Sequence, residues 1–224
     1  MKNIPDASID AIITDPPYWT TACKWDSVIP FEPMWAELKR IIKPSGAIVL
    51  FGSEPFSSAL RMSNLKMYKY DWIWNKKLAG NWILAKIQPL KIHEIISVFS
   101  KGKTMYIPQK TKGRFRKKMW LKESEITGGD SFSEITENDD YYPISIQDFS
   151  LAWLRRWRLH PTQKPVALLE YLIKTYTNEW ETVLDFTAGS WTTWVACKNT
   201  NRNYILIEKD ELYCNIIRNR LAPS

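Results

Sequence analysis

The tetrapeptide Asp15-Pro16-Pro17-Tyr18 offers groups that suit a planar amine. The Asp15 carboxylate and the Pro16 carbonyl are hydrogen-bond acceptors, and proline has no backbone N–H that could donate. Tyr18 adds a flat ring on which a base can stack. Two acceptors that take both N–H bonds of an exocyclic amine free its lone pair to attack an electrophile. The same residues also suit a stiff turn that merely ends a strand, and the tetrapeptide alone leaves both interpretations open.

Two further segments have the pattern of ligand-binding loops. Residues 183–190 form an apolar run that gives way to small residues, and Thr192-Thr193 begin a helical pattern, so free backbone N–H groups are expected in the turn. Glu208 follows the next apolar run, where an acid can bind ribose hydroxyls. By itself this is a weak nucleotide-site signal. The third segment, 160–165 (HPTQKP), is by itself an ordinary extended lead into a helix.

The elements that position these segments alternate between strand and helix. We predict strands at 9–15, 47–51, 70–74, 94–99, 182–186 and 204–207, and helices at 31–42, 54–62, 166–175, 192–198 and 211–221. Apolar strands joined by helices favour an α/β fold with an open, mostly parallel sheet and helices on both faces. Ligands bind such sheets at the carboxyl ends of strands, where Asp15 and the 185–190 turn are expected.

The middle of the chain breaks this alternation. Residues 101–122 are rich in Lys and Arg and contain no acid, whereas residues 123–148 are rich in Asp and Glu and contain no Lys or Arg. We therefore predict an insertion at 101–155, a basic arm followed by an acidic loop, between two parts of one domain at 1–100 and 156–224.

Composition excludes several classes of protein. The 224 residues are 45% hydrophobic and 25% charged, as in an ordinary globular chain and unlike a disordered one. No apolar run approaches the roughly 18 residues that span a bilayer, and no signal core is evident, so we expect a cytoplasmic protein without a membrane partner. The three cysteines form no CxxC pair, so no metal site is predicted. A net charge of +7 favours nucleic acid as a partner.

Taken together, DPPY at 15–18, HPTQKP at 160–165, DFTAGS at 185–190 and IEKD at 207–210 resemble the motifs of DNA amino-methyltransferases. The order, with the catalytic motif first and the cofactor motif last, resembles the β class, in which target recognition lies in the insertion between them. The resemblance covers nearly the whole chain except residues 101–155. It implies a Rossmann-like methyltransferase sheet, S-adenosylmethionine as cofactor and double-stranded DNA as partner. Members of this class often pair, which leaves a homodimer open.

The resemblance also implies roles for individual residues. Asp15 and the Pro16 carbonyl, in a loop stiffened by Pro17, would bond the target amine, and Tyr18 would stack on a base flipped out of the duplex. The cofactor would lie against Asp185, Phe186, Thr187, Gly189, Ser190, Thr192, Thr193 and Glu208, with Lys164 near its methionine end and Phe51 and Ser53 walling the pocket. Phosphates would meet the basic arm at Lys110, Lys112, Arg114, Arg116, Lys117 and Lys118.

Four tryptophans depart from the family pattern. Trp19, Trp180, Trp191 and Trp194 stand where the family usually has glycine, and the chain has 8 Gly and 12 Trp where average usage gives roughly 16 Gly. A tryptophan with positive φ costs about 1–3 kcal/mol, and the Trp191 ring would have to turn away from the cofactor. One common cause is the codon UGA, which some genetic codes read as tryptophan and others as glycine. Deliberate pocket-filling substitution would give the same pattern.

Three functional hypotheses follow from these observations. The intact DPPY motif, whose first residue is Asp, resembles adenine-N6 enzymes more than cytosine-N4 enzymes, and favours a DNA adenine-N6 methyltransferase of restriction-modification or phage type. The lost glycines favour a catalytically impaired, DNA-binding protein on the same fold. An RNA or protein amine methyltransferase is a third hypothesis, because the DPPY loop suits any planar amine.

Overall fold

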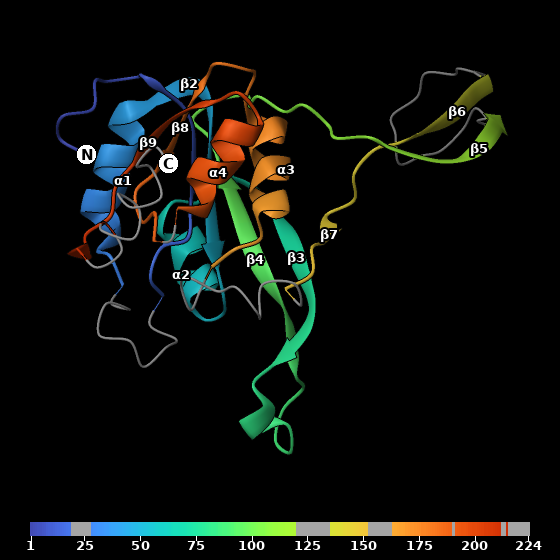
Figure 1. The fold of residues 1–224 in the computed structure, drawn as a ribbon, viewed down its shortest axis with the longest axis horizontal. Helices are drawn as coiled ribbons and strands as arrows, with labels where there is room; N and C mark the ends of the chain where they lie inside the picture. The colour runs from blue at the N-terminus through green and yellow to red at the C-terminus, as the bar shows by residue number, and fades with distance from the viewer. Residues whose placement is uncertain (19–27, 120–134, 152–162, 190, 212–213, 215–224) are drawn as a thin grey trace, which may run out of the picture. The chain divides into compact units, whose positions relative to one another are not determined.

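The computed structural model describes residues 1–18, 28–119, 135–151, 163–189, 191–211 and 214. The chain forms two compact units. The first comprises Met1–Ile107 and Ser145–Ser224 and is built on a seven-stranded sheet; the second, Pro108–Ile144, is built on a two-stranded sheet (Figure 1). No helix in the described residues is both long and apolar enough to cross a membrane.

The seven-stranded sheet confirms the predicted fold class. Its strands lie in the order β7 (Ile146–Asp148), β3 (Tyr68–Gly80), β4 (Lys91–Phe99), β2 (Ile42–Gly52), β1 (Ile9–Thr14), β8 (Thr182–Asp185) and β9 (Asn203–Leu206). Strand β1 pairs in parallel with β2 and β8, β8 with β9, and β3 with β7. Strand β4 is antiparallel to both of its neighbours. The sheet is therefore open and mostly parallel.

Helices cover both faces of this sheet, as predicted. Helices α1 (Phe31–Ile41) and α2 (Phe56–Ser63) supply one apolar cluster, while α3 (Val166–Tyr176) and α4 (Thr192–Asn199) supply the other. In β1, Ile9 and Ile12 belong to the first cluster and Ala11 and Ile13 to the second. Side chains alternate along a strand, so a strand buried on both faces is apolar throughout. This explains the apolar run at 11–13, whereas the buried Asp10 accepts bonds from Lys43 and from the Thr182 N–H.

Two elements, β2 and β3, differ most from the predicted bounds. Strand β2 begins at Ile42, directly after α1, although Pro44-Ser45-Gly46 was expected to lie between helix and strand. Pairing of Ile9 with Ile42 draws the segment into the sheet, and a Cβ at Gly46 would lie 2.7 Å from the Asp10 carbonyl oxygen. Strand β3 runs to Gly80 rather than Trp74 because it continues in a hairpin with β4, which a short 3-10 helix (Trp82–Leu84) caps. The predicted helix 211–221 falls almost entirely outside the described residues.

The second unit pairs the basic and acidic segments directly. Strand β5 (Thr111–Met119) is antiparallel to β6 (Ile135–Tyr141). The Lys112 ammonium lies 3.0 Å from an Asp139 oxygen and 2.8 Å from an Asp140 oxygen, and Lys117 lies 2.7 Å from Glu137. The acidic strand therefore offsets part of the charge of the basic strand.

Candidate active site

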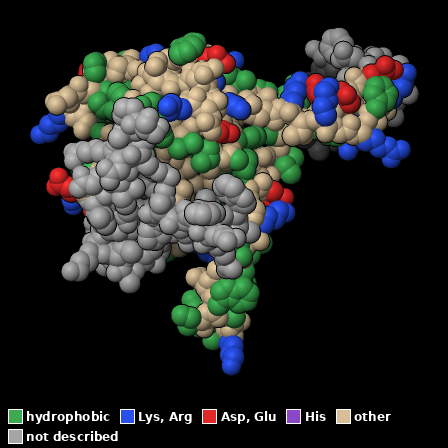
Figure 2. All heavy atoms as spheres, in the orientation of Figure 1, with side chains coloured by type: hydrophobic (Ala, Val, Ile, Leu, Met, Phe, Trp, Pro, Cys, Tyr) green, Lys and Arg blue, Asp and Glu red, His purple; other side chains and the backbone are tan. Residues whose placement is uncertain are grey.

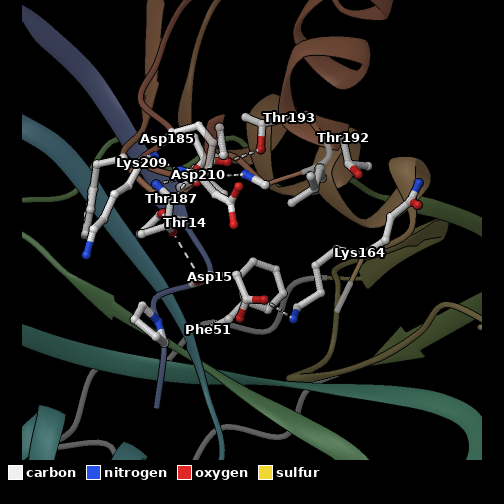
Figure 3. Close-up of a pocket in the computed structure, with 18 of the residues that line it drawn as sticks. Thr14, Asp15, Phe51, Lys164, Asp185, Thr187, Thr192, Thr193, Lys209 and Asp210 are labelled. Carbon is white, nitrogen blue, oxygen red and sulfur yellow. Dashed lines mark hydrogen bonds and ion pairs between the residues drawn. The ribbon is translucent and has the colours of Figure 1, made fainter. Parts of the chain in front are cut away.

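A cavity of about 410 Å³ opens at the carboxyl ends of β1 and β8, the edge where parallel sheets bind ligands (Figure 3). The residues around it come from both ends of the sequence. Most of the predicted site residues line it: Asp15, Pro17, Phe51, Lys164, Asp185, Phe186, Thr187, Gly189, Thr192, Thr193 and Glu208. Its size is in the range of small-molecule sites.

Among the described residues predicted for catalysis or cofactor binding, Pro16, Tyr18 and Ser53 do not line this cavity. Pro16 is buried beside it. The Tyr18 ring packs at a centroid distance of 5.5 Å from Phe56 of α2. The Ser53 hydroxyl accepts a hydrogen bond from the Lys91 ammonium. Ser190 lies outside the described residues.

Lys164 joins the catalytic loop to the sheet. Its ammonium lies 2.5 Å from Asp15 Oδ2 and 3.3 Å from Glu94 Oε2 of β4 (Figure 3 shows the contact with Asp15). The Lys164 side chain is 7% exposed and also lies over the Phe51 ring, 5.2 Å from its centroid. Pro165, at the N-cap of α3, is in an extended conformation, and Lys164 directly before it lines the cavity. Residues 160–162 are outside the described part.

The charges of this cluster depend on one another. Burial raises the pKa of Asp15, the Lys164 charge opposes that rise, and the pKa settles at about 6. Burial lowers the pKa of Lys164, but the negative charges of Asp15 and Glu94 outweigh burial and leave that pKa raised. Burial also raises the pKa of Glu94, but Lys164 and Lys76 outweigh it, so the pKa lies below its ordinary value. At neutral pH we therefore expect two carboxylates around one ammonium.

One oxygen of Asp15 is available for a ligand. Its Oδ2 is bonded to Lys164, whereas its Oδ1 is buried and has no hydrogen-bond partner among the described residues. A buried acceptor left without a donor costs about 1–3 kcal/mol. Such an atom beside a cavity is suited to accept an N–H from a ligand.

Asp185 is fixed by threonines from three segments. Its Oδ1 accepts bonds from the Thr14 hydroxyl at 2.6 Å and the Thr187 N–H at 3.1 Å, and its Oδ2 accepts the Thr193 hydroxyl. The Thr187 hydroxyl lies 3.0 Å from the Asp15 carbonyl oxygen, to which it donates. Burial raises the pKa of Asp185 despite these bonds. The network ties the loop after β1 to the loop after β8.

Glu208 closes the far side of the cavity. Its Oε2 accepts the Gly189 N–H at 2.7 Å, and its Oε1 accepts the N–H groups of Lys209 and Asp210. Gly189 has φ 50°, a conformation that glycine adopts without steric cost. The acid after β9 and the small-residue turn after β8 therefore meet, as their positions in the sequence predict.

The unusual tryptophans have distinct environments. Trp180 and Trp191 have φ angles of 68° and 59°, in the left-handed region. Trp191 precedes α4 and does not line the cavity, but its indole nitrogen is buried without a partner among the described residues, as is that of Trp194. Trp19 is outside the described part. The Trp191 ring thus leaves the pocket open.

The predicted DNA-binding residues lie apart from this cavity in sequence and belong to the second unit. Lys112 and Lys117 are ion-paired with β6, the Lys110 ammonium lies 4.6 Å from the Tyr142 ring centroid, and the Arg116 guanidinium lies 4.5 Å from that of Tyr141. Arg114 is exposed. The side chain of Lys118 is not described. A role for these residues with DNA stays a prediction.

Sequence reasoning missed Glu94. It lies in the strand pattern IHEIISVF, where a charged residue among apolar ones is a signal, because Glu is almost never buried without a partner. Sequence reasoning also missed other residues that line the cavity, among them Ile13, Thr14, Ile29, Leu169, Lys209 and Asp210.

Comparison with known proteins agrees with this geometry. A family model described as DNA methylase (N6_N4_Mtase) matches residues 9–219. The chain is 29% identical to the type II methyltransferase M.HpaI of Haemophilus parainfluenzae, covering 99% of this chain and 70% of that protein. It is 28% identical to the DNA adenine methyltransferase YhdJ of Escherichia coli K12, covering 99% and 79%.

Solved structures of DNA methyltransferases resemble this chain in fold. The M1.HpyAVI–SAM complex superposes with a TM-score of 0.65 at 26% identity, covering 98% of this chain and 91% of that one. The PvuII cytosine-N4-specific DNA methyltransferase superposes with a TM-score of 0.66 at 16% identity, which establishes likeness of fold.

Proposed function

Because the chain belongs to the N6/N4 family of DNA methylases, and uses S-adenosylmethionine to methylate DNA, we propose that its target is the N6 amino group of adenine in a base flipped out of the duplex. One observation carries the proposal: Asp15 Oδ1, beside the cavity, has no hydrogen-bond partner among the residues that the structure describes. It supplies an acceptor where an exocyclic amine would need one. The similarity to the adenine methyltransferase YhdJ supports the same base.

The cavity residues fit S-adenosylmethionine. Two carboxylates, Asp185 and Glu208, offer acceptors for a hydroxyl-bearing and positively charged ligand, and the turn with Gly189 allows close approach of the backbone. Phe186 adds an apolar surface for an adenine ring. When bound, the cofactor supplies an electrophilic methyl group on a sulfonium.

The chain's own contribution is to orient the amine. Asp15, ionised at neutral pH and held by Lys164, would accept one N–H, and the Pro16 carbonyl would accept the other. Both bonds turn the amine lone pair toward the cofactor, and Tyr18, steadied by Phe56, would stack on the base. Catalysis then rests on positioning and on preorganised acceptors. No covalent bond between enzyme and base is required.

The setting we propose is a restriction-modification or phage system acting in the cytoplasm on double-stranded DNA, with the second unit as the target-recognition region. The similarity to type II methyltransferases supports it. A homodimer is compatible with this proposal.

The test is methylation of unmethylated genomic DNA with S-adenosylmethionine, followed by mass spectrometry of the digested nucleosides. We expect N6-methyladenine. N4-methylcytosine would keep the enzyme class and refute the choice of base. The matched control is the Asp15→Asn variant, which keeps the shape of the side chain and removes its charge.

A second candidate is a DNA-binding protein with impaired catalysis. Two features of Trp191, beside the cofactor loop, favour it: a strained backbone and a buried indole nitrogen without a partner in the described part of the chain. DNA binding without methyl transfer, under conditions where Trp191→Gly restores transfer, would establish this alternative.

A further inference from the structure

The β3–β4 hairpin extends past the rest of the sheet at the catalytic edge. Strand β3 runs parallel to β2, because both are antiparallel to β4, so its carboxyl end lies at the same edge as Asp15. The β2 pairing stops at Gly52 opposite Ile95, whereas β4 continues back to Lys91. Residues 91–94 therefore extend roughly 13 Å past the end of the β2 pairing, at the usual rise of a strand. The tip of the hairpin lies beyond them (Figure 1).

The tip, residues 81–90, is both ordered and apolar. Backbone bonds from Leu84, Ala85, Ile87 and Gln88 to residues 81–84 hold it in a compact turn. Yet Ile83 is 97% exposed, Ile87 78% and Trp82 63%. Because the turn is already ordered, its exposed apolar side chains would lose little conformational entropy on binding. They are therefore suited to insertion into a partner.

The charge around the tip indicates the partner. Between Gly80 and Lys91 the sequence has no Asp or Glu, and Lys86 at the tip is exposed, whereas Lys76 and Lys77 at the base of the hairpin are ion-paired with Glu94 and Asp148. Figure 2 shows hydrophobic and basic side chains together on this projection. A basic, apolar knob complements a polyanion with stacked apolar bases inside it, and apolar side chains such as isoleucine are the usual wedges between base steps.

We propose that this tip is a wedge that enters duplex DNA beside the active site and lowers the cost of extruding the target base. The proposal rests on the proposed function for its substrate. Unstacking a base costs a few kcal/mol, and a wedge at the catalytic edge would occupy the space that the base leaves.

The experiment compares two double variants by fluorescence anisotropy with a labelled duplex. Ile83→Ser with Ile87→Ser removes the wedge. Met62→Ser with Leu65→Ser is the matched control, because these residues are also exposed and apolar but lie where α2 ends and before β3 begins, at the opposite edge. We expect the tip variant to bind the duplex at least fivefold more weakly and the control to bind normally. A mismatch opposite the target adenine should recover methylation by the tip variant.

Equal duplex binding by the two variants would overturn the wedge, whether or not the protein methylates DNA. Loss of a dimer in sedimentation velocity by the tip variant, with duplex binding per subunit retained, would also overturn it and assign the tip to a second copy of the chain. Failure of methylation by the unsubstituted protein, with the binding difference intact, would count against the proposed function alone.

A separate observation concerns residues 180 and 191. Bulky residues are outliers at positive φ, yet both tryptophans adopt it. Trp180 is 70% exposed and the Trp191 indole nitrogen has no partner among the described residues, so neither side chain offsets the strain. By contrast Trp35, Trp72 and Trp74 are buried, and their indole nitrogens donate bonds of 2.6 to 2.8 Å.

We infer that the codons at 180 and 191 are UGA and that the source organism inserts glycine there. Two measurements test this: the gene sequence and peptide mass spectrometry of the protein from its native source. We expect UGA codons and glycine-containing peptides at both positions, with UGG and tryptophan at 35, 72 and 74. UGG at 180 and 191, or tryptophan in the native peptides at these positions, would overturn the inference.

Discussion

Replacing Lys164 with methionine tests how the active site keeps Asp15 ionised. Methionine has a similar length and no charge. The Asp15 pKa is about 6 with the ammonium 2.5 Å away, and an opposite charge at such distances lowers a carboxyl pKa by about 1–3 units. Without it, burial and the nearby Glu94 charge should raise the Asp15 pKa further.

The consequence for activity follows from the ionised fraction. At pH 7 about nine-tenths of Asp15 is ionised when its pKa is about 6. A rise as large as the contribution of an opposite charge would leave about one-half to one-hundredth ionised. If the ionised carboxylate accepts the amine N–H, methyl transfer by the variant at pH 7 should fall about 2-fold to about 100-fold and recover as the pH rises.

The assay is kcat/KM for DNA against pH at saturating S-adenosylmethionine, with the KM for the cofactor measured separately. Lys43→Met is the matched control, because Lys43 forms an ion pair of the same length, 2.5 Å, with Asp10 away from the cavity. Thermal unfolding checks that both variants are folded. An acidic limb of the Lys164→Met profile that stays near pH 6 would refute the reasoning.

Three other predictions concern single side chains. Asp15→Asn should abolish methyl transfer and leave duplex binding within about twofold, measured by anisotropy; equal loss of both would make Asp15 a structural residue. Glu208→Gln should weaken S-adenosylmethionine binding about 10-fold to 150-fold in calorimetry, because a charge-assisted bond is worth about 1.5–3 kcal/mol, and unchanged affinity would remove Glu208 from the cofactor site. Burial raises the pKa of Cys197 to about 12, so iodoacetamide at pH 8 should label Cys214 before Cys197, which should react only after denaturation; rapid native labelling of Cys197 would contradict its burial.

The elements and loops whose structure depends on local sequence could be predicted. The 9–14 strand is recognisable because burial on both faces makes most of its positions apolar. The 185–189 turn is recognisable because a strand followed by small residues and a helix start is typical of a ligand-binding loop. Asp15 and Asp185 are adjacent in space because β1 and β8 are parallel neighbours, so their loops share one edge. The resemblance to a known family assigned the roles that spacing alone left open.

The contacts that the sequence did not predict depend on which strands are neighbours in the sheets. Glu94 and Lys164 are far apart in the sequence, and they meet because β4 lies beside β2 and α3 packs on the same face. Nor did composition show that the basic and acidic segments pair as β5 and β6, since charge runs indicate solvent exposure whether or not they are neighbours. The extension of β3 was missed because its outer half lacks the apolar pattern of a core strand.

The arrangement around Lys164 solves a physical problem that Asp15 alone would face. A carboxylate buried without a partner takes up a proton, and a protonated Asp15 would lose acceptor strength toward an amine. One ammonium against Asp15 would restore the charge, but a second carboxylate, Glu94, fixes that ammonium from the sheet side, and Lys76 in turn lies 3.4 Å from Glu94. In this arrangement Lys164 donates to Asp15 Oδ2 and leaves Oδ1 for the substrate. The cluster therefore explains both why Asp15 keeps its charge at neutral pH and why one of its oxygens stays available.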